Sequence, residues 1–463
     1  MKTKKFLALL LCALMVSALF ACAQPAAPAT DETADMGTET TADTASTEKV
    51  KITYAQWGND SETAACKAVA DKFNASQDRI EVEVMQILHD EYMTKLNTMA
   101  TADELPDTAI MSEAGVLQWA QQGMLADISS MYGEGESKPL ECLAFKYNGQ
   151  TVAYSAANEI LLTYYNREMF DEAGVDYPPA SADGAWTWDE FVATAKKLTL
   201  DQNGLHPDDP GFDANNIVQY GCYVNTLAWQ LEVWCLSNGS GFYSADGSTV
   251  TIADPAAAEA LQKIADLYLV DHVAPEPTSF SLTVDQALAT KQVAMFTDGA
   301  WDVGTCLGAA KEAGLDYGVG VLPKMEKAVT ICTGGPNVVF STTKHPAEAM
   351  EWIKWYYQEE NSWSLIEAGT WMPILEKWYT DDELTHKWVD NPNFPAYDEY
   401  KSAVVDYAMN NAVSTSWYYV NNTVDFNDLL GSILSDGVWQ GTKTAQDALS
   451  ENLPALEAAF EGN

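Results

Sequence analysis

Basic side chains are scarce in this sequence, and their scarcity limits the partners that the chain can bind. The 463 residues include 25 Lys and Arg against 67 Asp and Glu, which gives a formal net charge of −42. Nucleic-acid binding requires Lys and Arg to replace the counterions along the phosphates. A strongly acidic surface also repels phosphate-rich ligands and anionic membranes. The composition therefore disfavours nucleic acid as a partner.

The motifs of several enzyme classes are also missing. The five His residues are scattered without an H-E-x-x-H pair, and neither a G-x-x-x-x-G-K-[ST] loop nor a G-x-S-x-G turn is present. We therefore expect no metal and no cofactor. A glycosidase stays open as an alternative, because 67 carboxylates offer many acid pairs. The order of the expected strands does not suggest an eightfold barrel.

No C-x-x-C pair occurs, although six cysteines follow residue 22: Cys66, Cys142, Cys222, Cys235, Cys306 and Cys332. An even number permits disulfides, but six cysteines allow fifteen pairings, so the sequence does not decide between them. A chain of this length can fold without disulfides. We expect these cysteines to be mostly buried small apolar residues.

Long apolar runs are absent beyond the N-terminus, where a short one follows the basic segment Met1–Lys5. Phe6–Phe20 is too short for a bilayer span of about 20 residues and is typical of a signal peptide. Leu19–Cys22 resembles a bacterial lipobox, which implies cleavage before Cys22 and lipidation of its thiol; an ordinary signal peptide is the alternative. We predict a lipoprotein signal peptide over residues 1–21 and a lipid-anchored, disordered linker over residues 22–48, a stretch without aromatic side chains.

From residue 49 onward the sequence alternates between strand and helix patterns. Val50–Trp57 alternates and is rich in β-formers, and Ala65, Val69 and Phe73 follow at helical spacing. Further strands are expected at Arg79–Leu88, Thr108–Met111 and Leu161–Tyr165, and further helices at Tyr92–Ala100, Asn166–Ala173 and after Thr187, Asp254-Pro255 and His345-Pro346. This order predicts an α/β fold with parallel, doubly wound sheets.

A series of short motifs occurs in a characteristic order, and the strongest of them is Val293–Trp301 (VAMFTDGAW). The others are Ile52–Asp60, Leu105–Asp107, Gly123–Asp127, Tyr164–Gly174, Thr187–Phe191, Gly334–Asn337 and Lys344–Ala349. Together they resemble family 1 extracellular solute-binding proteins, the sugar-capturing subunits of ABC importers. The resemblance covers roughly residues 49–375.

The resemblance implies a periplasmic-binding-protein-like fold of two α/β lobes, with doubly wound sheets joined by crossover hinge strands. Lobe one would comprise residues 49–154 with 330–369, and lobe two residues 155–329 with 370–463. Hinges would lie near Ser155–Glu159, Lys327–Thr330 and Gly369–Pro373. The lobes would close on a mono- or oligosaccharide and deliver it to the membrane permease of an ABC importer. The protein would be a monomer, lipid-anchored on the extracytoplasmic face of the cell membrane.

A sugar site needs flat aromatic platforms for the C–H faces, with carboxylates and amides for the hydroxyls. The best candidate is Trp301, where the resembling motif places a stacking Trp. The expected ligand-binding residues are Trp57, Asn59, Asp60, Glu113, Glu159, Trp229, Trp301, Asn337, Trp371 and Trp417. Core packing would also account for Trp57, and a solvated loop position for Glu113. Asn337, which follows Gly334-Gly335, is expected in a cleft loop, with a plain turn as the alternative.

Two further alternatives are open. The strong acidity also suits a cationic solute such as a polyamine, or a peptide, held by Trp and acidic side chains. In addition, the acidic loop over residues 201–213 gathers oxygen ligands without matching the EF-hand pattern, so calcium binding there is undecided and a solvated loop is favoured.

Overall fold

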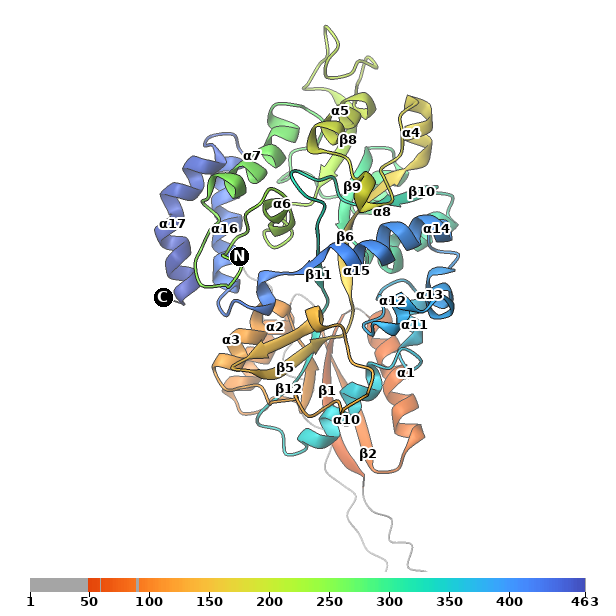
Figure 1. The fold of residues 1–463 in the computed structure, drawn as a ribbon, viewed down its shortest axis with the longest axis vertical. Coiled ribbons are helices and arrows are strands. Elements are labelled where there is room, and N and C mark those ends of the chain that lie inside the picture. Colours follow the sequence, from red (N-terminus) through yellow and green to blue (C-terminus); the bar gives the residue numbers. More distant parts are fainter. Residues whose placement is uncertain (1–48, 59, 89–90, 463) are drawn as a thin grey trace, which may run out of the picture. The chain divides into compact units, whose positions relative to one another are not determined.

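The computed structural model describes residues 49–58, 60–88 and 91–462 (Figure 1). The predicted signal peptide, the linker and the lipidation residue Cys22 lie outside the described residues. Within the described part of the chain, no helix combines the length and the apolar character needed to cross a membrane.

The first of two sheets has the strand order β2-β1-β3-β12-β5-β4. Its strands are β1 (Val50–Trp57), β2 (Ile80–Ile87), β3 (Thr108–Ile110), β4 (Ala144–Tyr147), β5 (Gln150–Ser155) and β12 (Pro336–Val339). In Figure 1, β12 lies among the red and orange strands although it is distant from them in sequence. The helices that pack on this sheet are α1 (Asp60–Ser76), α2 (Tyr92–Thr101), α3 (Glu113–Gln121) and α10 (Pro346–Tyr356).

The second sheet has the order β13-β11-β6-β9-β8-β7, with β10 also paired to β6. Its strands are β6 (Glu159–Asn166), β7 (Leu200–Asp201), β8 (Ile217–Val224), β9 (Val293–Gly299), β10 (Tyr317–Gly320), β11 (Thr330–Thr333) and β13 (Ala412–Ser414). Around it lie α4 (Arg167–Ala173), α5 (Trp188–Leu198), α6 (Glu232–Ser237), α7 (Pro255–Leu269), α8 (Val284–Ala289) and α9 (Gly308–Glu312).

The C-terminal part of the chain is mainly helical. Its longer helices are α13 (Asp382–Val389), α16 (Val424–Ile433) and α17 (Ala445–Glu461), with the shorter α11 (Trp363–Glu367), α12 (Lys377–Thr380), α14 (Tyr397–Tyr400) and α15 (Tyr407–Asn411) between them. Helices α16 and α17 bury Phe426, Leu430 and Leu449 in the core that covers α7. Two helix-covered sheets confirm the predicted two-lobed α/β fold.

Strand direction departs from the sequence prediction. Strands β1, β2 and β3 are parallel, as expected. However, β12 is antiparallel to both of its neighbours, and β6 is antiparallel to β9, β10 and β11. Both sheets are therefore mixed, and the prediction of parallel sheets was wrong outside the βαβ units.

Helix boundaries follow the signals in the sequence. Thr187 caps α5 in a capping box with Glu190: the Glu190 N–H donates to Thr187 Oγ1 at 3.3 Å, and the Thr187 N–H donates to Glu190 Oε2 at 2.8 Å. Helices α7 and α10 each begin with proline. Proline lacks an N–H, and this costs nothing at the first helical position, where an N–H would have no partner within the helix. Helix α4 ends at Gly174 in the left-handed conformation.

Two short connections join the two sheets, and these connections lie side by side. Residues 156–158 lead from β5 to β6, and Gly334 with Gly335 lead from β11 to β12. The Ala156 N–H donates to the Gly335 carbonyl at 2.9 Å, which ties one connection to the other. Strand β11 pairs within the second sheet, although the predicted boundary at residue 330 assigns it to lobe one. The lobe boundaries themselves stay a prediction.

All six cysteines of the described chain are free thiols. Cys66, Cys222, Cys235 and Cys332 are buried, and Cys142 and Cys306 are half-buried. The expectation of mostly buried cysteines is confirmed.

Candidate ligand-binding site

Three of the predicted tryptophans meet beside the carboxyl end of β9 in the second sheet. The ring centroid of Trp229 lies 5.0 Å from that of Trp417 and 6.1 Å from that of Trp301. Trp229 precedes α6, Trp301 follows β9, and Trp417 belongs to the short helix η6 (Ser416–Tyr418). Trp229 is partly buried and packs against both hydrophobic core clusters of the protein. The fold thus gathers three residues that are distant in sequence into one aromatic cluster.

The carboxylate of Asp298, at the end of β9, fixes the segment that carries Trp229. Its oxygens accept hydrogen bonds from Asn225 Nδ2 and Gln230 Nε2, each at 3.1 Å, and from the Gly299 N–H at 2.9 Å. Burial raises the pKa of Asp298, while these hydrogen bonds favour the charged form. Asp298 therefore holds the Trp229 segment beside the turn that carries Trp301.

Gly299 allows Trp301 to fold back over the strand end. A Cβ atom at Gly299 would lie 2.1 Å from the six-membered ring of Trp301. The indole of Trp301 consequently lies directly against the Gly299 backbone. Any larger residue at position 299 would displace the indole from this position.

A second buried carboxylate connects α6 to Trp417. Glu232 Oε2 accepts hydrogen bonds from the Ser416 N–H at 3.2 Å and from Ser416 Oγ at 3.0 Å. Burial, the largest cause, raises the pKa of Glu232 to about 7, while the two bonds from Ser416 oppose this shift. Glu232 thus fixes the helix that carries Trp417 relative to the helix that follows Trp229.

The same η6 helix also rests on the first sheet. The ring of Tyr418 stacks on Phe145 of β4 with centroids 4.2 Å apart, and its hydroxyl lies 2.8 Å from Ser155 Oγ on β5. Thr423 Oγ1, just beyond η6, donates to the Ala114 carbonyl at 3.2 Å. The tryptophan cluster therefore lies at the junction of the two sheets, where a ligand between lobes would have to bind.

A second group of predicted residues surrounds the Thr333–Gly335 connection. Glu113, the first residue of α3, accepts hydrogen bonds from Thr333 Oγ1 at 2.8 Å and from the Gly334 N–H at 3.0 Å. Glu159 lies opposite Thr333 in the pairing of β6 with β11. Burial, followed by the charge of Glu113, raises the pKa of Glu159 well above its usual range.

Trp57 completes this group. Its ring lies edge-on to Tyr92 with centroids 5.5 Å apart, and it packs so closely on Gly335 that a Cβ there would lie 2.5 Å from it. The two groups are linked through the backbone, since the Ala300 N–H donates to the Ile160 carbonyl at 2.9 Å, next to Trp301 and Glu159.

The remaining predicted residues are placed differently. Trp371 packs edge-on against Tyr356 at a centroid distance of 5.8 Å, in a segment bonded to Asn158 through the Met372 carbonyl. Asn337 lies within β12 and has no exposed surface, so the prediction of a cleft loop there was wrong. Its Oδ1 instead accepts a bond from the Tyr54 hydroxyl at 2.7 Å. Asn59 and the side chain of Asp60 lie outside the description.

Sequence reasoning missed the acids and amides that hold the tryptophans, namely Asp298, Glu232, Gln230 and Asn225. For Asp298 a signal was available, because it stands three positions before Trp301 in the Val293–Trp301 motif. For Glu232 the sequence offered no such signal, since its partner Ser416 is distant in sequence and only the fold brings the two together.

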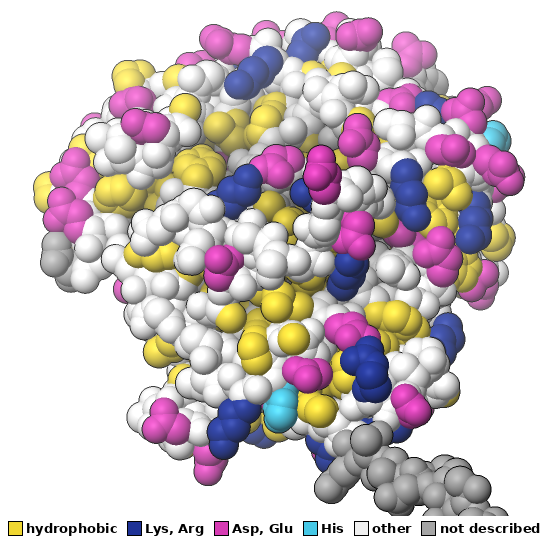
Figure 2. Space-filling model, turned by 60° about the horizontal axis from the view of Figure 1, so that its bottom comes forward, with side chains coloured by type: hydrophobic (Ala, Val, Ile, Leu, Met, Phe, Trp, Pro, Cys, Tyr) yellow, Lys and Arg dark blue, Asp and Glu magenta, His cyan; other side chains and the backbone are white. Residues whose placement is uncertain are grey.

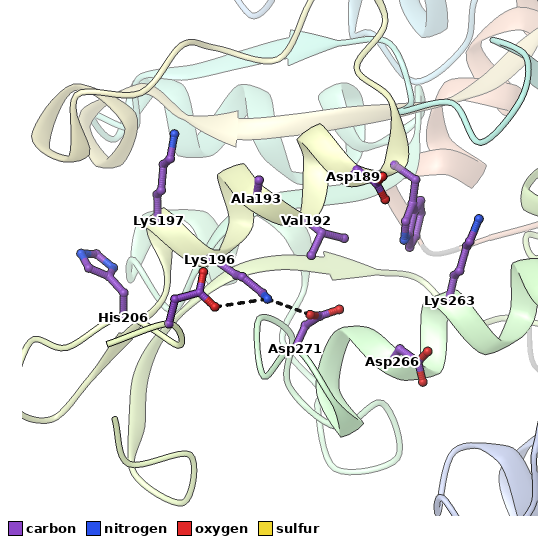
Figure 3. Close-up of a pocket in the computed structure, with 11 residues that line it drawn as sticks. Asp189, Val192, Ala193, Lys196, Lys197, His206, Lys263, Asp266 and Asp271 are labelled. Atoms are coloured by element: carbon purple, nitrogen blue, oxygen red, sulfur yellow. Dashed lines mark hydrogen bonds and ion pairs between the residues drawn. The ribbon is translucent and has the colours of Figure 1, made fainter. Parts of the chain in front are cut away.

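A separate hollow of about 570 Å³ lies between α5 and α7 (Figure 3). Lys196 lines this hollow, and its Nζ forms ion pairs with the carboxylates of Asp271 at 3.0 Å and Asp208 at 3.4 Å. None of the ten predicted ligand-binding residues lines this hollow. It is therefore distinct from the tryptophan cluster.

The acidic loop over residues 201–213 turns its first carboxylate inward. Asp201 Oδ1 accepts hydrogen bonds from the N–H groups of Asn203 at 2.8 Å and Leu205 at 2.9 Å, and Oδ2 accepts one from the Asp213 N–H at 2.9 Å. These bonds fold the loop around the Asp201 carboxylate. No group of three or more potential metal-ligating side chains occurs among the residues that the structure describes.

Acidic side chains are spread over the face shown in Figure 2 rather than gathered in one patch. On the face in Figure 2, Asp and Glu side chains are dispersed, with Lys and Arg interspersed among them. On this face the negative charge is therefore not concentrated at one site.

Comparison with known proteins agrees with this architecture. Residues 68–396 match the family model described as bacterial extracellular solute-binding protein. The lactose-binding protein of Rhizobium radiobacter is 20% identical over 323 residues, which cover 67% of this chain and 71% of the relative.

Two solved structures share the fold. The ABC substrate-binding protein of Listeria monocytogenes in complex with cycloalternan superposes with a TM-score of 0.71 and 22% identity, covering 90% of this chain and 100% of that one. The cyclic alpha-maltosyl-1,6-maltose binding protein of Arthrobacter globiformis gives a TM-score of 0.70 with the same identity of 22% and the same coverage of 90% and 100%. These relatives are binding proteins rather than enzymes. Because the family match spans well over half of the sequence, the chain belongs to the bacterial extracellular solute-binding proteins.

Proposed function

We propose that this protein captures a mono- or oligosaccharide between its two lobes and delivers it to the membrane permease of an ABC importer. The observation that carries the proposal is the cluster of Trp229, Trp301 and Trp417 at the junction of the two sheets. Indole rings offer apolar faces that match the C–H faces of a pyranose. The sugars in the names of the relatives, among them lactose and cycloalternan, support the same ligand class.

Each part of the proposed site has a distinct role. Trp301, Trp229 and Trp417 are the stacking platforms, with Trp57 and Trp371 as further aromatic candidates. Glu113 and Glu159 are the acids that would bind sugar hydroxyls. The connections at residues 156–158 and at Gly334-Gly335 would act as hinges, because only a few residues there have to change conformation when the lobes close.

Anchoring is a separate part of the proposal and rests on the sequence alone. Lipidation of Cys22 would hold the protein on the extracytoplasmic face of the membrane, since two or more acyl chains give stable attachment. Replacing Cys22 by serine should release the protein from the membrane fraction, whereas an unchanged membrane fraction would contradict the anchor.

The ligand is identified by a thermal-shift screen after unfolding and refolding, which removes any carried-over ligand. The panel contains mono- and oligosaccharides, polyamines and peptides. A ligand at 100 times its Kd stabilises the protein by about 2.7 kcal/mol, enough to raise Tm by several degrees. A polyamine or peptide response with silence from every sugar would overturn the proposed substrate class.

The Trp301→Ala variant tests the site itself. Loss of a stacking platform should weaken binding of the sugar found in the screen by about tenfold or more, or about 1.4 kcal/mol. The matched control is Trp355→Ala, because Trp355 packs on Phe73 and Trp352 in the first sheet's core. The control should lower Tm and leave the Kd unchanged; equal effects of the two variants on Kd would contradict the assignment.

One observation favours a second candidate, a carbohydrate-active enzyme. Glu113 bonds to Thr333, the register partner of Glu159, and burial followed by the charge of Glu113 raises the pKa of Glu159 well above its usual range. Such a pair is the usual machinery of glycosidases. Recovery of the bound sugar intact supports capture, and recovery of cleaved sugar would replace it by hydrolysis.

A further inference from the structure

Two of the six cysteines approach each other where the two sheets meet. Cys332 lies in β11 of the second sheet and is fully buried, and Cys142 lies half-buried in the short helix η2 (Glu141–Leu143), which leads into β4 of the first sheet. Cys332 Sγ lies 3.9 Å from the carbonyl oxygen of Cys142, and the two thiols are close enough for each to shift the pKa of the other. The remaining thiols have other neighbours: Cys235 contacts the Ala257 carbonyl, and Cys306 that of Asp302.

The surrounding backbone holds the pair together from both sides. Ser414 of β13 donates through Oγ to the Cys142 carbonyl at 3.2 Å, and Ser414 is also the register partner of Cys332. On its other side, Cys332 is paired with Ile160 of β6. Strand pairing therefore fixes Cys332 on both sides, and the Ser414 hydroxyl holds the Cys142 backbone beside it.

The two thiols differ in character as an attacking and a resolving cysteine should. The contact with the Cys332 thiol lowers the pKa of Cys142, against the effects of burial and of the neighbouring Glu141 charge. The same contact and burial raise the pKa of Cys332. Because the thiolate is the nucleophile in disulfide exchange, Cys142, which is also the more accessible of the two, is the residue that reacts first.

We propose that Cys142 and Cys332 are a reversible disulfide site, oxidised by a small-molecule or protein disulfide outside the cytoplasm. The Cys142 thiolate attacks one sulfur of the oxidant, and the other oxidant sulfur leaves as a thiolate. The Cys332 thiol then loses its proton and attacks Cys142 Sγ of the mixed disulfide, which expels the second oxidant thiolate. Two protein thiols become one disulfide, and the oxidant disulfide becomes two thiols.

The bond has a mechanical consequence, because it crosses from one sheet to the other. It ties η2, ahead of β4, to β11, which runs directly into the Gly334-Gly335 connection. Any rotation at this connection that separates η2 from β11 would be opposed by the bond. The disulfide therefore acts as a clamp on the proposed hinge and favours the arrangement of sheets in which the thiols meet.

The test is peptide mapping of the full chain after treatment with oxidised glutathione, alkylation of free thiols and digestion without reduction. We expect one cross-linked peptide pair that joins Cys142 to Cys332 and disappears on reduction, with Cys66, Cys222 and Cys235 alkylated only after unfolding. Recovery of Cys142 and Cys332 as separate alkylated peptides would overturn the proposal.

Variants distinguish the two roles. Cys332→Ala should trap Cys142 as a mixed disulfide with glutathione, and absence of that adduct would contradict the attacking role of Cys142. Cys306→Ser is the matched control, since Cys306 is also half-buried, and it should leave the cross-link intact. The clamp predicts a higher Tm for the oxidised wild-type protein than for the reduced one, a difference that Cys142→Ser abolishes. An unchanged Tm after proven cross-linking would contradict the clamp.

Discussion

Gly299 is the residue whose small size permits the position of Trp301. Gly299→Ala places a Cβ 2.1 Å from the indole ring, so the ring has to move off the strand end. We expect sugar affinity to fall by about tenfold and stability by about 1–3 kcal/mol, measured by calorimetry and by urea unfolding.

The control for this substitution is Gly133→Ala, where the nearest atoms, 3.6 Å or more away, belong to the side chain of Glu136. It should leave both quantities nearly unchanged. An affinity for Gly299→Ala equal to that of the wild type would exclude Trp301 from the ligand platform in the position described.

Glu232 should make the stability of the protein depend on pH. Its pKa is about 7 in the folded protein against 4.5 in the unfolded chain. Between these values the unfolded chain releases the proton while the folded protein keeps it, so the free energy of unfolding falls as pH rises and stays low above pH 7. Glu232→Gln keeps an acceptor for Ser416 and removes the titration. Relative to wild type, the variant should gain up to about 3 kcal/mol in urea unfolding between pH 5 and pH 8, whereas parallel pH profiles would contradict the assignment.

At the scale of single residues, the sequence predicted the aromatic candidates for the site but not the residues that contact and hold them. Trp229, Trp301 and Trp417 were predicted individually, Trp301 and Trp229 because the family resemblance implies stacking aromatic residues in these stretches. Asp298 and Glu232, which hold them, were not predicted, because one acid among 67 has no distinguishing mark without its partners. Asn337 was misplaced because Gly334-Gly335 indicates a turn, and the turn ends one residue before Pro336 begins β12.

The start of α5 offers a test at the scale of one element. Thr187→Ala removes the oxygen that accepts the Glu190 N–H, which leaves one helix N–H without a protein partner. We expect a loss of about 1 kcal/mol and a Tm lower by about 2 °C, with unchanged sugar affinity.

Thr98→Ala is the matched control, because Thr98 is exposed inside α2 and its hydroxyl donates to the Thr94 carbonyl of the same helix. Alanine has the higher helix propensity there, so the variant should be as stable as the wild type or slightly more stable. Equal losses from Thr187→Ala and Thr98→Ala would show that the capping box does not stabilise α5.

Elements were predicted well wherever the signal was local. The helix starts at Thr187, Pro255 and Pro346 depend on neighbouring residues, and all three were correct. Strand direction is not local: β12 pairs with β3 and β5, which lie far from it in sequence, and its short connection from β11 forces it into the first sheet as an antiparallel strand. A sequence pattern carries no information about that pairing.

Because of the net charge of −42, we expect salt to change the stability of the whole molecule without changing its affinity for a sugar. Like charges spread over the surface repel one another and destabilise the compact state, and salt screens this repulsion over a distance of about 10 Å at 0.1 M. Tm should therefore rise with salt concentration. A neutral sugar held by tryptophan faces and short hydrogen bonds gains nothing from that field, so its Kd should stay within about twofold between roughly 20 and 500 mM NaCl.

Titration calorimetry and thermal unfolding on the same samples measure both quantities. A cationic ligand would behave in the opposite way, because its attraction to the acidic surface weakens as salt is added while the protein becomes more stable. A Kd that rises steeply over a range in which Tm also rises would mean that the acidic surface participates in recognition. In that case the tryptophan cluster would be an aromatic cage for a cation rather than a platform for a sugar.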